Sequence, residues 1–288
     1  MTSLMEHMLE IENRTKEINL TPDELAKIID HTELAPNKPA GSMKRLCDEA
    51  RTHHFYAVCV NPFWTRFCKS ELEGTDVKVD TVIGFPLGQT TTDEKVFETK
   101  RAIEEGADEI DMVMNIAAFK DKGYDFVGDE IEAIVEAAGG NTVKVILETG
   151  YLTYEEIPKA CKIVKETGAK FVKNSTGFGP LGATIPHIVL MRESVGKNFG
   201  VKASGGIGNF KDALRMIAAG ANRIGSSSGV KIIEGYRWAK SAGWPIEKIP
   251  CNLCPTSEAT FENMPEDVSR YYKEQCAECQ YNEFKKFY

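Results

Sequence analysis

The chain has 288 residues, of which 42% are hydrophobic and 27% charged, which is enough to build a sizeable core. Its 35 basic and 43 acidic side chains give a net charge of −8, which disfavours nucleic acid as a partner and favours a small molecule. No apolar stretch approaches the ~20 residues that span a bilayer, and the polar start does not resemble a secretion signal, so we expect no membrane partner and a cytoplasmic location.

Short runs typical of buried strands alternate along the chain with longer helical patterns. The clearest runs are YAVCV (56–60), VKVDTVIGF (77–85), EIDMVM (109–114), VKVIL (143–147), FVK (171–173) and VKA (201–203). Two weaker runs, at 27–30 and 222–226, bring the number of predicted strands to eight. Few runs alternate between polar and apolar residues, so most of these strands should be covered on both faces.

The segments between these runs have the periodicity of helices. One apolar stripe consists of Ile157, Ala160, Cys161 and Val164, and another of Phe126, Val127, Ile131, Ile134, Val135 and Ala138. Several helices are predicted to begin with a capping box, because a threonine is followed three residues later by a glutamate. These threonines are Thr21, Thr91 and Thr153.

One local motif recurs at 105–113, 167–173 and 219–225, where a helix end passes through Gly-Ala and a polar residue into a strand. Glycine accepts the left-handed conformation that ends a helix, so each copy predicts a tight helix-to-strand turn between parallel strands. Eight such units favour an α/β fold of the closed (β/α)8 TIM barrel type over an open doubly wound sheet. We assign this barrel to 21–245, an N-terminal helical extension to 1–20, and a C-terminal appendage containing cysteines to 246–288.

Polar residues near the predicted strand ends are the first candidates for a site, because the functional groups of parallel barrels gather there. These residues are Asp30, Cys59, Asp111, Lys173 and Lys202. A positively charged Lys202 beside Lys173 would favour the neutral amine of Lys173, which can attack a carbonyl group. Asp111 lies among apolar neighbours and needs a cation to remain ionised, which the lysines would provide.

Two glycine-rich stretches predict a phosphate site. SGGIG (204–208) and GSSSG (225–229) each precede a predicted helix and expose backbone N–H groups and hydroxyls where anions bind. They follow the last two predicted strands, which is the usual position of a phosphate in this architecture.

At these residues the sequence resembles the deoxyribose-phosphate aldolases, class I aldolases that cleave 2-deoxy-D-ribose 5-phosphate reversibly to acetaldehyde and D-glyceraldehyde 3-phosphate. The similarity runs from about residue 25 to 240. It includes IDHTEL (29–34), AVCVNP (57–62), TVIGFPLGQTTTDEKVFETKRAIEEGADEIDMVMN (81–115), FVKNSTGFG (171–179), VKASGGIG (201–208) and RIGSSSG (223–229).

The resemblance implies that Lys173 forms the Schiff base, that Lys202 and Asp111 transfer protons, and that no metal or other cofactor is needed for catalysis. The implied substrate-binding residues are Asp30, Cys59, Thr176, Gly177, Gly205, Gly206, Gly225, Ser227 and Ser228. One departure is Asn174, because the family more often has threonine directly after the Schiff-base lysine. This difference affects substrate preference more than reaction class.

Other interpretations of the same residues stay open. A lysine at a strand end commonly reaches into solvent or pairs with a carboxylate, and Asp111 could be only its ion-pair partner. Cys59 is better explained as a pocket or core residue than as a nucleophile, and His31 as a histidine hydrogen-bonded to a loop. Two alternative functions are a Schiff-base lyase acting on another phosphorylated sugar and a catalytically silent barrel used as a binding module.

The eight cysteines fall into two groups. Cys47, Cys59, Cys68 and Cys161 are scattered and are expected to be free thiols. The tail contains two CxxC pairs, formed by Cys251, Cys254, Cys276 and Cys279. Four thiolates with this spacing suit a tetrahedral structural zinc, and the alternatives are labile disulfides or unligated thiols. The tail could also contact another subunit of a homo-oligomer.

Overall fold

The structure is a computed structural model that describes residues 4–242, and side chains are described from residue 10 to residue 241. The predicted appendage at 246–288, with its four cysteines, lies outside the described residues. The division of the chain at residues 20 and 245 therefore stays a prediction.

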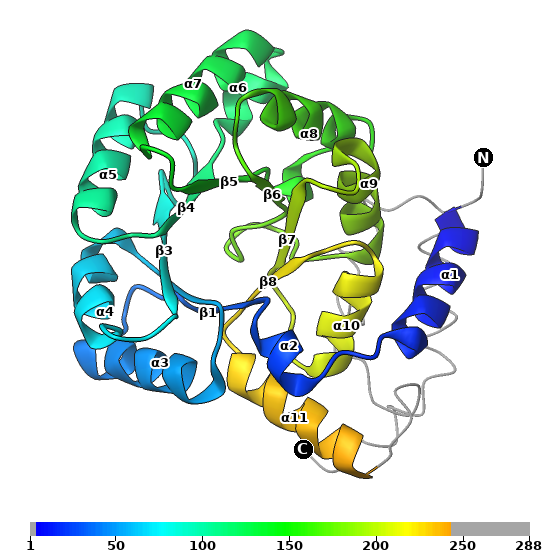
Figure 1. The fold of residues 1–288 in the computed structure, drawn as a ribbon. Coiled ribbons are helices and arrows are strands. Elements are labelled where there is room, and N and C mark those ends of the chain that lie inside the picture. Colours follow the sequence, from blue (N-terminus) through cyan, green and yellow to red (C-terminus); the bar gives the residue numbers. More distant parts are fainter. Residues whose placement is uncertain (1–3, 243–288) are drawn as a thin grey trace.

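Eight parallel strands form a closed barrel in which each strand pairs with the next one and β8 pairs with β1 (Figure 1). The strands are β1 (Ile29–Glu33), β2 (Ala57–Val60), β3 (Lys78–Ile83), β4 (Glu109–Val113), β5 (Thr142–Ile146), β6 (Phe171–Lys173), β7 (Gly200–Ser204) and β8 (Arg223–Ser226). The predicted (β/α)8 barrel is confirmed.

Helices surround the barrel and connect its strands. The α-helices are α1 (Leu4–Glu17), α2 (Pro22–Ala26), α3 (Ala40–His53), α4 (Thr65–Glu71), α5 (Thr92–Glu104), α6 (Ile116–Lys120), α7 (Tyr124–Ala137), α8 (Glu156–Glu166), α9 (Ile185–Val195), α10 (Phe210–Ala218) and α11 (Gly229–Ala242). Two short 3-10 helices are η1 (Pro62–Trp64) and η2 (Thr149–Tyr151). Within the described residues, no helix has the length and apolar character needed to cross a membrane.

The first predicted strand, at 27–30, was misplaced. Lys27 caps the C-terminus of α2, and the N–H of Ile28 donates to the carbonyl of Leu25, so both residues belong to the helix end. Strand β1 instead continues to Glu33, because His31, Thr32 and Glu33 still pair with β2.

The predicted turns and helix starts are largely confirmed. Gly106, Gly168 and Gly220, in the three Gly-Ala motifs, have φ values of +101°, +84° and +113°. Thr21 and Thr91 form capping boxes. Thr153 and Glu156 exchange the same pair of hydrogen bonds just before α8.

The predicted stripe on α8 is fully buried, but Phe126 on α7 was wrongly assigned to the core, because 47% of it is exposed. Val127, Ile131 and Ile134 are the residues of α7 that face the barrel. Phe126 precedes Val127 by one residue, which on a helix is a rotation of about 100° away from that stripe.

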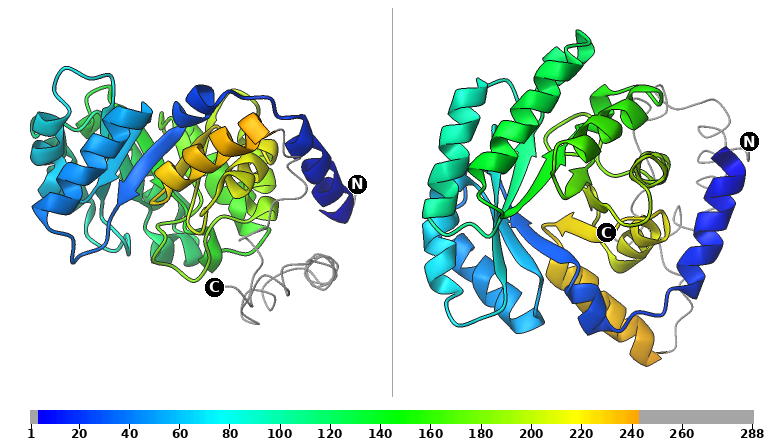
Figure 2. Two further views of the ribbon diagram at one scale, coloured as in Figure 1. Left: turned by 90° about the horizontal axis from the view of Figure 1, so that it is seen from below. Right: turned by 45° about the horizontal axis from the view of Figure 1, so that its top comes forward.

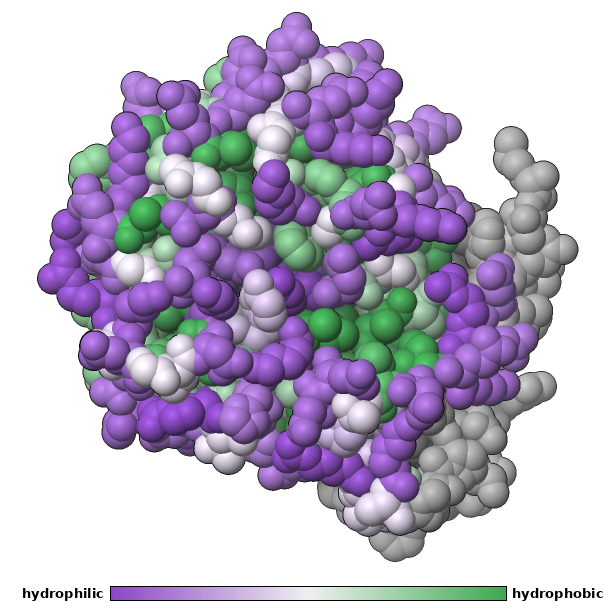
Figure 3. Space-filling model, viewed as in Figure 1, coloured by the Kyte–Doolittle hydropathy of each residue, from purple (hydrophilic) through white to green (hydrophobic). Residues whose placement is uncertain are grey.

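Helix α1 lies outside the ring of helices, beside α9 and α10 (Figure 2). Glu12 on α1 forms an ion pair with Arg215 on α10 at 2.7 Å, and Ile11 is buried in the core. The face seen in Figure 3 is mostly hydrophilic, with apolar side chains gathered to the right of its centre.

Candidate active site

Charged side chains from several strands meet in the interior of the barrel. Contacts across the barrel join strands on opposite sides, such as Lys202 on β7 with Asp80 on β3. We call the eight residues involved the central charge cluster: Asp30, Asp80, Glu109, Asp111, Lys144, Lys173, Lys202 and Arg223. Its four carboxylates balance its four cations, which is the condition under which buried charges are tolerated.

Asp111 connects the three lysines of this cluster. Its Oδ2 lies 2.7 Å from Nζ of Lys173 and 2.7 Å from Nζ of Lys202, and its Oδ1 lies 2.8 Å from Nζ of Lys144. Burial raises the pKa of Asp111, but the three lysines outweigh that effect and hold it well below its ordinary value. Asp111 is therefore an ionised carboxylate that bridges Lys173 and Lys202, which pair in register on β6 and β7.

Lys202 and Lys144 are each held by three carboxylates. Lys202 contacts Asp30 at 2.5 Å and Asp80 at 2.8 Å in addition to Asp111. Burial lowers the pKa of Lys202, but these carboxylates raise it well above its ordinary value. Lys144 contacts Asp80, Glu109 and Asp111, and its pKa is likewise raised despite burial. Both side chains are therefore fixed ammonium ions.

Lys173 differs from the other two lysines. In the part of the chain that the structure describes, its Nζ contacts only the carboxylate of Asp111. It is also the last residue of β6, and 2% of it is exposed, whereas Lys144 and Lys202 are fully buried. Of the three lysines, Lys173 is thus the one that has room for another partner.

The sequence placed all five strand-end candidates at the barrel mouth, the end where the strands have their C-termini. The structure corrects this for Asp30, which lies inside the barrel at 0% exposure, bound to Lys202 and to Arg223 at 3.0 Å. Burial raises the pKa of Asp30, but these two cations lower it below the ordinary value. Asp111 and Lys202 also lie within their strands rather than at the ends.

Four members of the central charge cluster were not predicted: Asp80, Glu109, Lys144 and Arg223. Burial, followed by the neighbouring Asp111, raises the pKa of Asp80 to about 6. Arg223 pairs with Glu109 at 2.9 Å and lies over the ring of Tyr56. The available signal was that each of the four interrupts a predicted strand, and that Glu109 lies two residues from Asp111, on the same strand face.

Cys59 lies beside the carboxylates but is not a reactive thiol. Burial raises its pKa well above the ordinary value, and Asp80 adds to this effect. It packs in a small apolar cluster with Leu34 and Val82, against which Phe85 rests. Phe85 in turn meets the ring of Phe178 edge-on, with 5.4 Å between ring centroids.

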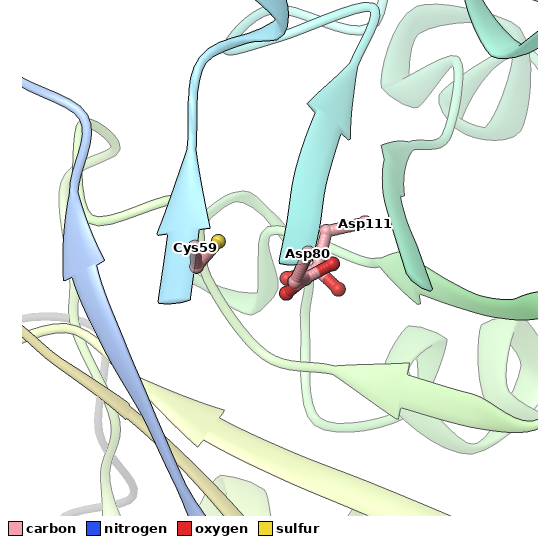
Figure 4. Close-up of side chains that lie close together, drawn as sticks. All are labelled: Cys59, Asp80 and Asp111. Carbon is pink, nitrogen blue, oxygen red and sulfur yellow. The ribbon is translucent and has the colours of Figure 1, made fainter. Parts of the chain in front are cut away.

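The sulfur of Cys59 and the carboxylates of Asp80 and Asp111 come close enough together to share a metal ion (Figure 4). Both carboxylates, however, already bind the ammonium groups of Lys144 and Lys202. A divalent cation would have to displace these lysines, and the protonated thiol is a poor ligand. The donor set therefore suits ammonium groups better than a metal.

Serine hydroxyls tie together the loops that follow β6, β7 and β8. Oγ of Ser204 donates to the carbonyl of Ser175 at 2.6 Å, and Oγ of Ser226 donates to the carbonyl of Ile207 at 2.7 Å. The N–H of Gly177 donates to Oγ of Ser175 at 3.0 Å. The two glycine-rich stretches are thus adjacent at the barrel mouth, as predicted.

The glycines predicted to bind phosphate differ in their surroundings. Gly177 and Gly206 have φ values of +84° and +78°, and a Cβ on either would meet nothing within 4 Å, so both border open space. Gly205, with φ +89°, packs against Gly182. Gly225 is buried in β8, where a Cβ would lie 3.2 Å from Cε of Lys202, so its role is to make room for that lysine.

The two predicted serines lie between β8 and α11. Ser227 is exposed, while Ser228 is partly buried and its N–H donates to Oγ of Ser226 at 3.0 Å. Residues 227 and 228 form a turn, and Gly229 begins α11, where backbone N–H groups are available to an anion. We call these three residues together the 227–229 turn.

Thr176 and Asn174 hold the loop that follows Lys173. Thr176 donates both its N–H, at 3.1 Å, and its hydroxyl to Oε2 of Glu148. Glu148 is a buried residue whose backbone φ is +51°, and the sequence analysis did not single it out. Oδ1 of Asn174 accepts the N–H of Ser204 at 2.7 Å. Asn174 therefore links the ends of β6 and β7, directly above the paired lysines.

Comparison with known proteins agrees with this geometry. Residues 25–235 match the family model described as DeoC/LacD family aldolase. A deoxyribose-phosphate aldolase from Clostridium tetani is 58% identical over 212 residues, which cover 73% of this chain and 98% of that protein. One from Thermococcus kodakarensis is 56% identical over 216 residues, which cover 74% of this chain and 96% of that protein.

Solved structures show the same relationship. A putative deoxyribose-phosphate aldolase from Coccidioides immitis superimposes with a TM-score of 0.73 at 40% identity, covering 82% of this chain and all of that one. The deoxyribose phosphate aldolase from Aeropyrum pernix, described as having a unique tetrameric structure, gives a TM-score of 0.75 at 32% identity. The match covers 80% of this chain and 97% of that one. With its closed barrel, its bridged lysine pair and a family match over most of its length, the chain belongs to the DeoC/LacD family of aldolases.

Proposed function

We propose that this protein is a deoxyribose-phosphate aldolase that reversibly cleaves 2-deoxy-D-ribose 5-phosphate to acetaldehyde and D-glyceraldehyde 3-phosphate, with Lys173 forming the Schiff base. The observation that carries the proposal is the unequal binding of the three buried lysines. Lys202 and Lys144 each contact three carboxylates, whereas the described contacts of Lys173 end at Asp111. A nucleophilic amine must be able to leave its ion-pair partners and meet a carbonyl, and of the three lysines Lys173 has the fewest such partners to leave.

The cleavage then follows from the chemistry of an imine. The neutral amine of Lys173 attacks C1 of the open-chain sugar, the C1 oxygen leaves as water, and a protonated imine forms. Loss of the C3 hydroxyl proton breaks the C2–C3 bond, and its electrons move into the imine to give an enamine and glyceraldehyde 3-phosphate. Protonation of the enamine at C2, followed by hydrolysis, releases acetaldehyde and restores the amine of Lys173.

Asp111 and Lys202 are the proposed proton-transfer groups. Asp111 touches both Lys173 and Lys202 through a single oxygen, so a proton can pass between the two lysines and the carboxylate over short distances.

The phosphate is proposed to bind where the loops after β7 and β8 meet. Support comes from the open space at Gly206, from the exposed Ser227, and from the serine hydrogen bonds that join these loops. Phosphate binding by these loops would orient the sugar so that its C1 faces the amine of Lys173.

Borohydride trapping tests the Schiff base. Treatment with 2-deoxyribose 5-phosphate and borohydride should fix a covalent adduct that mass spectrometry locates on Lys173, and Lys173→Arg should abolish both adduct and turnover. Lys170, an exposed lysine three residues before Lys173, provides the matched control, and Lys170→Arg should retain both. Absence of the adduct in the native protein would favour a catalytically silent barrel instead.

A substrate panel tests the choice of sugar. Aldehyde release from 2-deoxyribose 5-phosphate is compared with release from other phosphorylated sugars on the same purified protein. A preference of roughly tenfold or more for another sugar would overturn the proposed substrate and leave the Schiff-base chemistry in place.

We also propose a cytoplasmic homo-oligomer. The four cysteines of the barrel are free and buried, which suits a reducing compartment, and the relative from Aeropyrum pernix is described as tetrameric. Light scattering of the purified chain gives its mass in solution and decides the assembly.

For the tail we propose a structural zinc held by the two CxxC pairs, on the basis of their spacing alone. Metal analysis should find one zinc per chain in the native protein and a loss in Cys276→Ser. A metal-free native protein, with four titratable thiols or two disulfides, would refute this.

A further inference from the structure

His31 lies next to the central charge cluster in sequence but faces the other way. On β1 its neighbour Asp30 points into the barrel toward Lys202, while the His31 ring is buried outside the barrel, with 3% exposed. His31 pairs in register with Ser226, the last residue of β8, which immediately precedes the 227–229 turn. One strand thus contacts both the lysine layer and the base of the proposed phosphate site.

The ring is held by a carboxylate on one side and an aromatic ring on another. Nε2 of His31 lies 2.7 Å from Oε2 of Glu49 on α3, and the ring of Phe55 lies 4.9 Å away between centroids. Burial lowers the pKa of His31 against the opposing effect of Glu49, which favours the neutral imidazole. A neutral imidazole has one N–H, and the Glu49 carboxylate assigns it to Nε2.

The other nitrogen faces the first residue of α11. A Cβ built on Gly229 would lie 2.8 Å from Nδ1 of His31 and 3.0 Å from Cζ of Phe55. The backbone of Gly229 therefore rests directly on the His31 and Phe55 rings, and no side chain fits between them.

Elsewhere this turn has little packing behind it. Two cavities of about 210 and 530 Å³ flank the His31 ring, and both are lined by His31, Glu49 and Ser227. With open space on either side, the His31 and Phe55 rings beneath Gly229 and the hydrogen bond from Ser228 to Oγ of Ser226 support the 227–229 turn.

We propose that His31, fixed by Glu49, is a positioning residue for the phosphate-binding turn at 227–229 and so determines the preference for phosphorylated over unphosphorylated sugar. The inference rests on the proposed function, because it assumes that this turn binds the substrate phosphate. His31 does not touch the reacting atoms, and its effect is confined to the phosphate end of the substrate.

The test compares two sugars and two histidines. His31→Leu keeps an apolar body of similar length but loses the Glu49 hydrogen bond, and kinetics are measured with 2-deoxyribose 5-phosphate and with unphosphorylated 2-deoxyribose. We expect KM for the phosphorylated sugar to rise about tenfold, while kcat/KM for the unphosphorylated sugar stays within about twofold. His53→Leu is the control, since His53 stacks on the same Phe55 at 5.6 Å but contacts α11 at Arg237 rather than at the 227–229 turn.

Equal losses with both sugars, or no change with either, would overturn the proposal. If His31→Leu does not fold, Glu49→Gln decides, because Glu49 is partly exposed and its change should give a smaller shift in the same direction. Affinity for inorganic phosphate, measured by calorimetry, is read independently of turnover. If the native protein binds phosphate, His31→Leu weakens that binding, and neither protein cleaves 2-deoxyribose 5-phosphate, the proposed function alone is contradicted.

Discussion

Replacing Lys144 by methionine would remove one cation from the central charge cluster while keeping a side chain of similar length. Asp80, Glu109 and Asp111 would each lose a contact of 2.7–3.1 Å, and the interior would hold four carboxylates against three cations. At an effective dielectric constant near 20, two unit charges at these separations attract each other by about 5–6 kcal/mol before desolvation is subtracted. Breaking a buried ion pair typically costs about 3–5 kcal/mol, a large part of the ~5–15 kcal/mol that stabilises a domain.

The loss should depend on pH. Asp80 already has a pKa raised to about 6, and without Lys144 it would rise further. The folded variant would then bind a proton that the unfolded chain releases above about pH 4, so lowering the pH from 8 to 5 stabilises the variant relative to the native protein. Asp80→Asn combined with Lys144→Met leaves three carboxylates and three cations, so the charges balance again. The double variant should recover most of the lost stability at pH 8.

Urea unfolding at pH 5 and pH 8 measures both effects. Lys95→Met is an informative comparison, because Lys95 is also fully buried but pairs with Glu130 outside the barrel interior, so Asp80→Asn should not rescue it. A loss below about 1 kcal/mol for Lys144→Met, or a double variant no more stable than the single one, would refute the view that charge balance holds the interior together.

Three further predictions concern the site. Asp111→Asn should lower kcat by about 100-fold or more in protein that is still folded, whereas a purely structural ion-pair partner would lower the melting temperature and leave kcat intact. Asn174→Ala leaves the buried N–H of Ser204 without its acceptor and should cost about 1–3 kcal/mol in urea unfolding, with the borohydride adduct retained. Glu148→Gln weakens the two bonds from Thr176, so KM should rise several-fold while the trapped adduct remains; an unchanged KM would contradict this.

The fold could be predicted from local patterns because each of its signals is short in sequence. The Gly-Ala turns need only a left-handed glycine, and the capping boxes need only a threonine and a glutamate three residues apart. The same reasoning misplaced β1, since nothing within 27–33 shows that Lys27 and Ile28 close a helix before the strand begins.

The site was predicted only in part, for a related reason. Lys173, Lys202 and Asp111 could be found because they interrupt strands close to their predicted ends. Lys144 and Asp80 were missed because their importance depends on which residues face each other across eight strands, and the register that decides this is not written in any one segment. Asp30 was assigned to the mouth for the same reason, although its side chain is bound to Lys202 inside the barrel.

The balanced interior also limits how the sequence can change over time. A single substitution that adds or removes a charge among these eight positions leaves one buried charge unpaired and destabilises the protein. Two compensating substitutions on facing strands can leave stability unchanged. Members of the cluster without a proposed role in catalysis should therefore vary together among relatives, as the paired Arg223 and Glu109 could. A designer who wishes to introduce new chemistry here should exchange residues two at a time.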